Sequence, residues 1–331
     1  MKKYIIIIIS LLLANDLFSQ ERLASTIYFK SGKETIEGIL VRPNNKSDTP
    51  AVVFQQGSGP HSFEGYETKA WGPHGYYIED VLLEQGYAVL YCNKRGLGKS
   101  TGNWKKNSFD GRANDAYAAV TYLKTLPFID STRIGISGHS QGGWIAQIVA
   151  AKHSDIAFVI SLAGPTVGVK AQTGSNDSLR YRCEGYSGER LVKKMKKDRK
   201  HKQLGYNVGK TFGFIGSARF WYLIADYDND EVLKSIKCPT LFLFAEHDIN
   251  VDPDQNIAHF NEVFDNNPPD NFTIEVMKNG QHGFYVVNDR CVDWATAEKR
   301  PFDPQFKELI RQWLIELNNL QKTDIDKFGK P

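Results

Sequence analysis

The chain has 331 residues, a formal net charge of +3, 41% hydrophobic residues and 12% aromatic residues. This length allows one large domain or two modest ones with a substantial core, and the aromatic content argues against a disordered chain. A charge so close to neutral gives no general case for nucleic-acid binding, so we expect no nucleic acid among the partners.

The first 19 residues have the pattern of a secretory signal peptide. Lys2 and Lys3 precede an apolar block over residues 5–13, and small and polar residues follow it. The block is about half the roughly 20 residues that a membrane-spanning helix needs. A buried N-terminal helix is the alternative. We expect cleavage near Ser19 or Gln20 and an exported protein, periplasmic or extracellular, without a stable membrane anchor.

The four cysteines do not have the spacing of a metal site. They are Cys92, Cys183, Cys238 and Cys291, and no two of them form a C-x-x-C pair. We therefore expect no structural metal, and no motif predicts a cofactor. An exported chain can form a disulfide, and the sequence leaves the pairing open. Two of the cysteines lie in apolar strand-like runs, where a buried free thiol is the ordinary interpretation.

Predicted strands and helices alternate along the rest of the chain. The segment "TIYFKSGKETIEGILVRP" turns at Ser31-Gly32 and predicts a hairpin. Six apolar runs follow, and helical patterns cover about residues 78–85, 110–126, 144–153 and 306–318. The runs are PAVVFQ, YAVLYC, RIGIS, IAFVISL, PTLFLFA and NFTIEVM. This alternation predicts an α/β fold with a mostly parallel sheet and helices on both faces.

Residues 169–234 do not fit this alternation. The segment is polar, basic and aromatic, and it has no clear buried strand. It predicts a helical cap insertion that divides the core into residues 22–168 and 235–322. The basic run "KKMKKDRKHK" over residues 193–202 is interpreted as a solvated helix face, with attraction for anionic substrates or surfaces as the alternative.

The pentapeptide Gly138-His139-Ser140-Gln141-Gly142 follows a predicted strand and precedes a predicted helix. This is the setting of a nucleophile elbow, in which small residues permit a sharp turn that raises the serine hydroxyl above the sheet. The motif alone also occurs by chance. With this setting, the pattern predicts Ser140 as a nucleophile, and a purely structural serine is the alternative.

A serine hydroxyl needs a base and an orienting acid. Among eight histidines, His282 lies in the loop "NGQHGF" after the last predicted strand and is the expected base. Asp248 ends the run "TLFLFAEHD" and is the expected acid, with rivals at Glu246, Asp252 and Asp254. The chain order Ser140, Asp248, His282 is the order typical of this kind of site.

Two backbone amides are predicted to stabilise the developing oxyanion. One belongs to Gln141, the residue after the nucleophile. The other is assigned to Ser58 in "QQGSGP", where flanking glycines let the backbone approach a substrate. An ordinary glycine-proline turn is the alternative for this loop.

The stretch "NKRGLGKST" over residues 93–101 is half of a phosphate-binding loop. A complete motif requires glycine five residues before Gly98, where the chain has Asn93. We therefore interpret it as a tight turn at a strand end. Gly96 and Gly98 are expected to allow the backbone geometry of the turn, and Arg95 is expected to pair with a nearby acid or carbonyl.

Together these motifs resemble the α/β-hydrolase superfamily, and within it bacterial esterases, dienelactone hydrolases and prolyl-oligopeptidase-type catalytic domains. The likeness covers about residues 27–167 and 237–320 and rests on "GSGP", "NKRGLGKS", "GHSQGG", "FAEHD" and "GQHGF". It implies an α/β-hydrolase fold and a Ser-His-Asp triad. Two residues depart from the usual pattern: Asn93 replaces an aspartate, and Gln56 replaces a histidine before the oxyanion glycine.

Three functions fit these residues. The first is a secreted serine hydrolase that cleaves small carboxylic esters through an acyl-enzyme. The second is a peptidase acting on short peptides with the same residues, although no paired acidic motif for a substrate amino terminus is evident. The third is a ligand-binding protein on a hydrolase scaffold.

Overall fold

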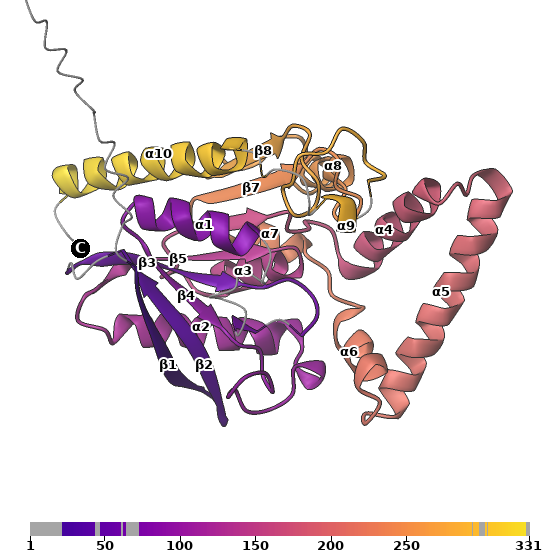
Figure 1. The fold of residues 1–331 in the computed structure, drawn as a ribbon, viewed down its shortest axis with the longest axis horizontal. Helices are drawn as coiled ribbons and strands as arrows, with labels where there is room; N and C mark the ends of the chain where they lie inside the picture. The colour runs from indigo at the N-terminus through magenta and orange to yellow at the C-terminus, as the bar shows by residue number, and fades with distance from the viewer. Residues whose placement is uncertain are drawn as a thin grey trace, which may run out of the picture.

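The computed structural model describes residues 22–43, 47–60, 62–63, 73–292, 294–297, 302 and 304–328. The predicted signal peptide lies outside these residues. Figure 1 shows a central sheet with helices packed on both sides and a group of helices that projects from one end. The predicted α/β class, with a mostly parallel sheet covered on both faces, is confirmed.

The sheet has eight strands in the order β1-β2-β4-β3-β5-β6-β7-β8. β1 and β2 form the predicted hairpin, and β2 also pairs antiparallel with β4; every other neighbouring pair is parallel. Since parallel strands end at the same edge, the loops after β3, β4, β5, β6, β7 and β8 meet there. The strands are β1 Leu23–Ser31, β2 Glu34–Arg42, β3 Thr49–Gln55, β4 Ala88–Cys92, β5 Ile129–His139, β6 Val159–Leu162, β7 Thr240–Ala245 and β8 Phe272–Met277.

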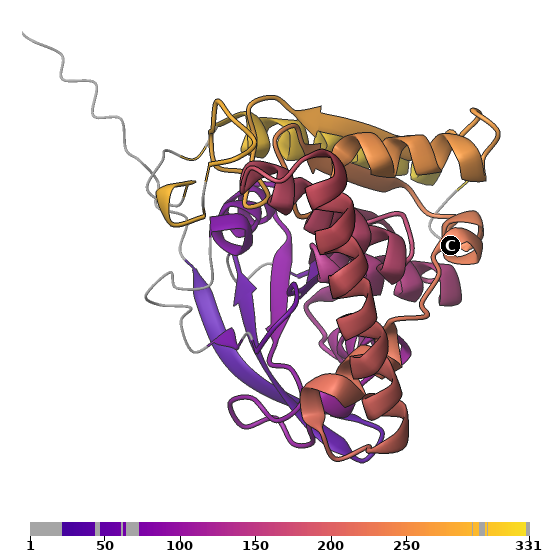
Figure 2. The ribbon, with the colours of Figure 1, turned by 90° about the vertical axis from the view of Figure 1, so that its right-hand side faces the viewer.

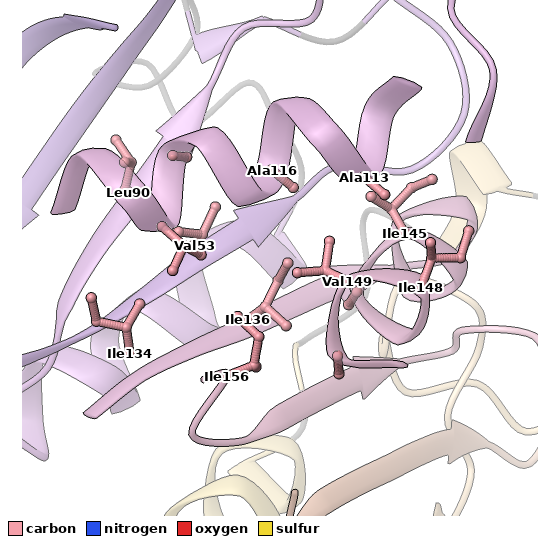
Figure 3. Packing of buried hydrophobic residues seen from close by; sticks show 14 of the residues in the cluster. Val53, Leu90, Ala113, Ala116, Ile134, Ile136, Ile145, Ile148, Val149 and Ile156 are labelled. Atoms are coloured by element: carbon pink, nitrogen blue, oxygen red, sulfur yellow. The ribbon is translucent and has the colours of Figure 1, made fainter. Parts of the chain in front are cut away.

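Two apolar layers hold the helices against the sheet. On one face, α2 (Phe109–Lys124) and α3 (Gln141–Lys152) pack on β3, β4 and β5, as Figure 3 shows for Ala113, Ile145 and Ile136. On the other face, α1 (Pro73–Glu84) and α10 (Pro304–Phe328) contribute side chains such as Ile78 and Phe306 to a second core. Burial of these side chains from water is the main favourable contribution to folding.

Helix α10 is longer than the predicted helix over residues 306–318. Among the residues of this helix up to 320, the last side chain in the core is Leu317, and that of Leu320 is 64% exposed. The prediction ended at residue 318 because polar residues predominate in the sequence after Leu317. Across the described helices, none combines the length and apolar character that crossing a bilayer requires.

The chain between β6 and β7 forms four helices, α4 Val169–Cys183, α5 Gly188–Thr211, α6 Gly216–Ile224 and α7 Asp230–Ser235. We call α4, α5 and α6 the cap. Figures 1 and 2 show the cap standing beside the sheet, with α5 running along the outside of the molecule. Residues 169–234 contain fourteen Lys and Arg against eight Asp and Glu, so this segment has a net charge of +6.

Helix α4 is attached to the loops that follow β7 and β8. The side-chain amide of Asn176 donates to the Ile249 carbonyl at 2.9 Å, and that of Gln172 donates to the Asn250 carbonyl. A disulfide joins Cys183, the last residue of α4, to Cys291 in the segment after β8. The other two cysteines are free thiols. The cap is therefore fixed to the segment that follows His282.

Candidate active site

Ser140 occupies a strained turn between β5 and α3. Its backbone has φ 55° and ψ −123°, a combination that costs a non-glycine residue about 1–3 kcal/mol. The Ser140 amide donates to the Leu162 carbonyl at 2.9 Å, and its carbonyl accepts from the Gly143 amide at 2.8 Å. These bonds hold the turn at the carboxyl edge of the sheet, where the side chain is partly exposed.

The glycines of the pentapeptide are required by close backbone contacts. A Cβ on Gly138 would collide with the Gly142 carbonyl, and a Cβ on Gly142 would collide with the Gln55 carbonyl at the end of β3. Gly57 lies directly beside Ser140, because a Cβ at that position would be 3.4 Å from the Ser140 Cβ. The loop after β3 therefore borders the elbow.

His282 and Asp248 form a buried pair at the same edge. His282 Nδ1 lies 2.7 Å from Asp248 Oδ2, and their side chains are 9% and 0% exposed. The other carboxylate oxygen, Oδ1, accepts from the amides of Asn250 at 2.7 Å and Val251 at 2.9 Å. The carboxylate is thus fixed in orientation and positioned to accept a hydrogen bond from Nδ1–H, which leaves Nε2 as the basic nitrogen.

The rival acids have other partners. Glu246 accepts from the Asn279 amide at 2.9 Å and lies 3.3 Å from Lys278 Nζ. Asp252 lies 3.5 Å from Arg290, and burial raises its pKa. Of these acids, the structure brings Asp248 to the His282 ring.

His139 contacts the His282 loop. Its Nε2 lies 2.9 Å from the His282 carbonyl oxygen, and the two rings are 4.7 Å apart between centroids. This contact links the elbow to the loop that carries His282. The side chains of Ser140 and His282 are not hydrogen-bonded to each other, although the serine and the His282–Asp248 pair lie at the same edge of the sheet.

Two basic side chains, Lys94 and Arg112, donate hydrogen bonds to the loop after β3. Lys94 Nζ donates to the Gly57 carbonyl and, at 2.7 Å, to the Gly59 carbonyl. Arg112, on the buried face of α2, donates to the Gln56 carbonyl at 2.8 Å and to the Gln141 side chain at 2.6 Å. Arg112 thereby connects the two segments that contain Ser58 and Gln141.

The turn over residues 93–101 has the predicted geometry. Gly96 and Gly98 have φ values of 76° and 53°, and a Cβ on Gly98 would collide with the side chains of Asn93 and Glu37. Arg95 makes a bidentate ion pair with Asp115, with its shortest distance at 2.7 Å. The expectations for Gly96, Gly98 and Arg95 are confirmed.

Asn93, the departure from the usual motif, is explained by a neighbouring acid. Its Nδ2 donates to Glu37 at 2.9 Å, and its Oδ1 accepts from the Phe63 amide at 2.7 Å. Burial opposes ionisation of Glu37, but hydrogen bonds from the Lys99 amide, Tyr28 and Asn93 outweigh it and lower its pKa. An aspartate at position 93 would place a second carboxylate against this one.

Asn93→Asp is expected to lower the free energy of unfolding by about 1–3 kcal/mol at pH 7, because two adjacent carboxylates cannot both ionise without repulsion. The parent gains stability from ionised Glu37 above the unfolded-state pKa and loses it on acidification, since the folded-state pKa is lowered. In the variant, protonation of one carboxylate removes the repulsion. The stability deficit should therefore shrink as the pH falls towards about 4, measured by urea unfolding. A pH-independent deficit would contradict this explanation.

Sequence reasoning missed Lys94, Arg112 and His139. Arg112 had a detectable signal, because it falls among the buried positions of α2, where an arginine needs a specific polar partner. Lys94 had no signal, since its acceptors are carbonyls of a loop some 37 residues earlier. The contact of His139 with the His282 loop also had no signal, since the two residues are 143 positions apart in the sequence.

A separate cavity of about 440 Å³ lies among the cap helices. Lys170, Arg199 and Lys202 line it together with Asp177, which is already paired with Lys202, and with the Trp221 side chain. The cavity is therefore predominantly cationic with an aromatic wall. Throughout the described ranges, no cluster of three or more His, Cys, Asp or Glu residues is arranged to hold a metal ion.

The fold and the residues at its carboxyl edge define a serine hydrolase of the α/β-hydrolase superfamily. Residues 35–212, more than half of the chain, match the X-Pro dipeptidyl-peptidase (S15) family. The chain belongs to that family. Both esterases and peptidases occur among the similar proteins.

Relatives cover different parts of the chain. The uncharacterized peptidase YuxL of Bacillus subtilis is 31% identical over 145 residues, 40% of this chain and 21% of that protein. Esterase EstD of Thermotoga maritima is 22% identical over 289 residues, 85% of this chain and 66% of that protein. The chain thus spans about a fifth of the first relative and just under two thirds of the second.

Solved structures share the fold. The structure of Est1E from Butyrivibrio proteoclasticus with bound ferulic acid aligns with a TM-score of 0.57 at 16% identity, covering 88% of this chain and 99% of that one. The Pyrococcus furiosus esterase Pf2001 aligns with a TM-score of 0.58 at 18% identity, covering 89% and 90%. The predicted α/β-hydrolase fold is confirmed by these likenesses.

Proposed function

We propose that this protein is an exported serine hydrolase that cleaves carboxylic esters through an acyl-enzyme. The observation that carries the mechanism is the buried His282–Asp248 pair, 2.7 Å apart, at the sheet edge where Ser140 occupies a strained elbow. A buried carboxylate that fixes one ring nitrogen leaves the other free to act as a base. The disulfide between Cys183 and Cys291 supports export, because such bonds persist mainly in oxidising compartments.

The reaction proceeds in two halves. Ser140 Oγ attacks the ester carbonyl carbon while His282 Nε2 takes the hydroxyl proton, and Asp248 stabilises the imidazolium that forms. The amides of Ser58 and Gln141 donate to the oxyanion of the tetrahedral intermediate. His282 then returns the proton to the departing alcohol. Water, activated by the same ring, hydrolyses the acyl-enzyme and releases the acid.

The charge of the cap favours ester substrates over dipeptide substrates. A peptidase that removes dipeptides binds a protonated amino terminus, which requires negative charge near the site. Here residues 169–234 have a net charge of +6. The cap cavity is lined by Lys170, Arg199 and Lys202 and by one acid, Asp177; Lys202 is paired with Asp177, and Lys170 with Asp226. Coulomb repulsion disfavours a cationic terminus and favours neutral or anionic acyl groups.

Peptidase activity is the second candidate, because family membership and the relative YuxL both favour it. The same serine, histidine and aspartate would attack an amide instead of an ester. A short peptide whose amino group is blocked would avoid the repulsion from the cap. Blocked and free peptides therefore belong in the same assay as esters.

The test is a panel of matched substrates at equal concentration. We expect p-nitrophenyl esters of short neutral acids and of a dicarboxylic acid half-ester to react with kcat/KM at least about tenfold above aminoacyl-prolyl arylamides. Higher kcat/KM for the free dipeptidyl arylamide would reject the ester proposal in favour of the peptidase. Turnover of neither class, with no labelling of Ser140 by a fluorophosphonate, would identify a non-catalytic binding protein.

A further inference from the structure

The loop after β3 has an unusual support. Two side chains donate hydrogen bonds to carbonyls of this loop: Arg112, which is buried, to Gln56, and Lys94, which is partly buried, to Gly57 and Gly59. Lys94 is the residue directly after Asn93, at the end of β4. The carbonyl groups of Gln56, Gly57 and Gly59 are therefore held by side-chain donors, whereas that of Ser58, between them, has no such donor among the described residues.

The direction of these carbonyls determines the direction of the amides. Every described peptide bond is trans, so the N–H of a peptide unit points opposite to its C=O. A Gly57 carbonyl that faces Lys94 inside the protein turns the Ser58 amide outwards, towards the side of the loop that borders Ser140. In the same way the Gln56 carbonyl, held by Arg112, turns the Gly57 amide outwards.

The second carbonyl bound by Lys94 belongs to the unit between Gly59 and Pro60. Proline has no amide hydrogen, so fixing this unit removes no donor from the site. It restrains the loop on the far side of Ser58. Lys94 thus holds the peptide unit that contains the Ser58 amide and the unit that follows Gly59.

We propose that Lys94 is a positioning residue for the oxyanion hole, which orients the Ser58 amide through the carbonyls of Gly57 and Gly59. This inference rests on the proposed function, since it assumes that Ser140 generates an oxyanion. In this role Lys94 acts through the loop backbone, so that the amide is already oriented before the reaction begins.

The environment of Lys94 is compatible with its two hydrogen bonds to the carbonyls of Gly57 and Gly59. Burial and the nearby charge of Arg112 lower the pKa of Lys94 well below its usual value. A neutral amine still has two N–H groups, so both carbonyls can remain bound after the proton is lost. The charged groups near Lys94 are Arg112, Arg95 and Asp115, and the last two are paired with each other.

The first measurement compares Lys94→Met with Lys106→Met, which changes an exposed lysine of the nearby turn at Trp104–Lys106. With a short p-nitrophenyl ester we expect Lys94→Met to lower kcat by roughly 10–100-fold with KM changed less than about threefold, since loss of one oxyanion donor costs roughly 10²–10³. Lys106→Met should equal the parent. A parent-like kcat in folded Lys94→Met would overturn the inference.

A transition-state analogue separates positioning from general loop stability. An alkylboronic acid forms a tetrahedral adduct whose oxygen occupies the oxyanion position, so its Ki should rise in Lys94→Met by the same factor as kcat/KM falls. An unchanged Ki with a reduced kcat would overturn the inference. If Lys94→Met does not fold, Lys94→Leu, which likewise carries no donor, is measured against the same two criteria.

A double-mutant cycle tests whether Lys94 acts through the Ser58 amide. Ser58→Pro removes the amide hydrogen itself, and adding Lys94→Met to it should lower kcat no further if Lys94 acts through that amide. Additive losses would overturn the inference. Ser140→Ala is measured in parallel: parent-like activity there would refute the proposed function, whereas an inactive Ser140→Ala with a parent-like Lys94→Met refutes the role of Lys94 alone.

Discussion

Ser140→Ala is expected to lower kcat/KM for a short p-nitrophenyl ester by roughly 10⁴–10⁶-fold, the largest effect of any single substitution in this chain. Without Oγ no acyl-enzyme can form, and the remaining rate comes from substrate binding and the oxyanion amides. The fold should be unaffected, because the Ser140 side chain makes no capping hydrogen bond and alanine is smaller. Steady-state kinetics and a thermal melt measure the two effects.

The matched control is Ser58→Ala. It removes an exposed hydroxyl and keeps the backbone amide that we assign to the oxyanion hole, so its kcat/KM should stay within about threefold of the parent. A fluorophosphonate should label the parent and Ser58→Ala but leave Ser140→Ala unlabelled. Ester hydrolysis by purified Ser140→Ala at the parent rate would exclude the mechanism.

Asp248→Asn is expected to lower kcat by about 10⁴-fold while the protein stays folded. The amides of Asn250 and Val251 donate to Oδ1, so the asparagine oxygen is retained at that position and its NH₂ group is directed at His282. The imidazole then carries its hydrogen on Nε2, facing the serine. In that tautomer it cannot accept the serine proton.

The control for this charge removal is Asp252→Asn. Asp252 lies in the same loop and interacts with Arg290 at 3.5 Å, outside the His282 pair. We expect less than about a fivefold change in kcat, measured with the same ester. Equal losses in the two variants would show that charge in this loop, rather than the tautomer of His282, controls the rate.

Much of the fold was predictable because the strands are buried on both faces. Runs such as "PTLFLFA" are apolar throughout, and the glycine-rich turns after them mark the edge where sites form. Asp248 was also accessible, since it lies three residues after β7, in the loop at that edge of the sheet. In the structure, the Asp248 carboxylate lies 2.7 Å from Nδ1 of His282.

The contacts that hold the site and the cap in place were harder to predict from the sequence, because they join segments that are far apart in the chain. Asn93 was read as a departure from a motif, whereas the reason for it is Glu37, 56 residues earlier on a neighbouring strand. The pairing of Cys183 with Cys291 depends on how α4 lies against the segment after β8, and sequence spacing does not encode that placement.

The disulfide also determines how the chain would respond to a cut in α5. That helix carries nine lysine and arginine residues and is largely exposed, which suits a trypsin-like protease. A single cut there would separate a fragment with Ser140 from a fragment with Asp248 and His282. Because Cys183 and Cys291 lie on opposite sides of α5, the two fragments would stay covalently joined. The nicked protein would then remain one molecule until a reductant released its halves.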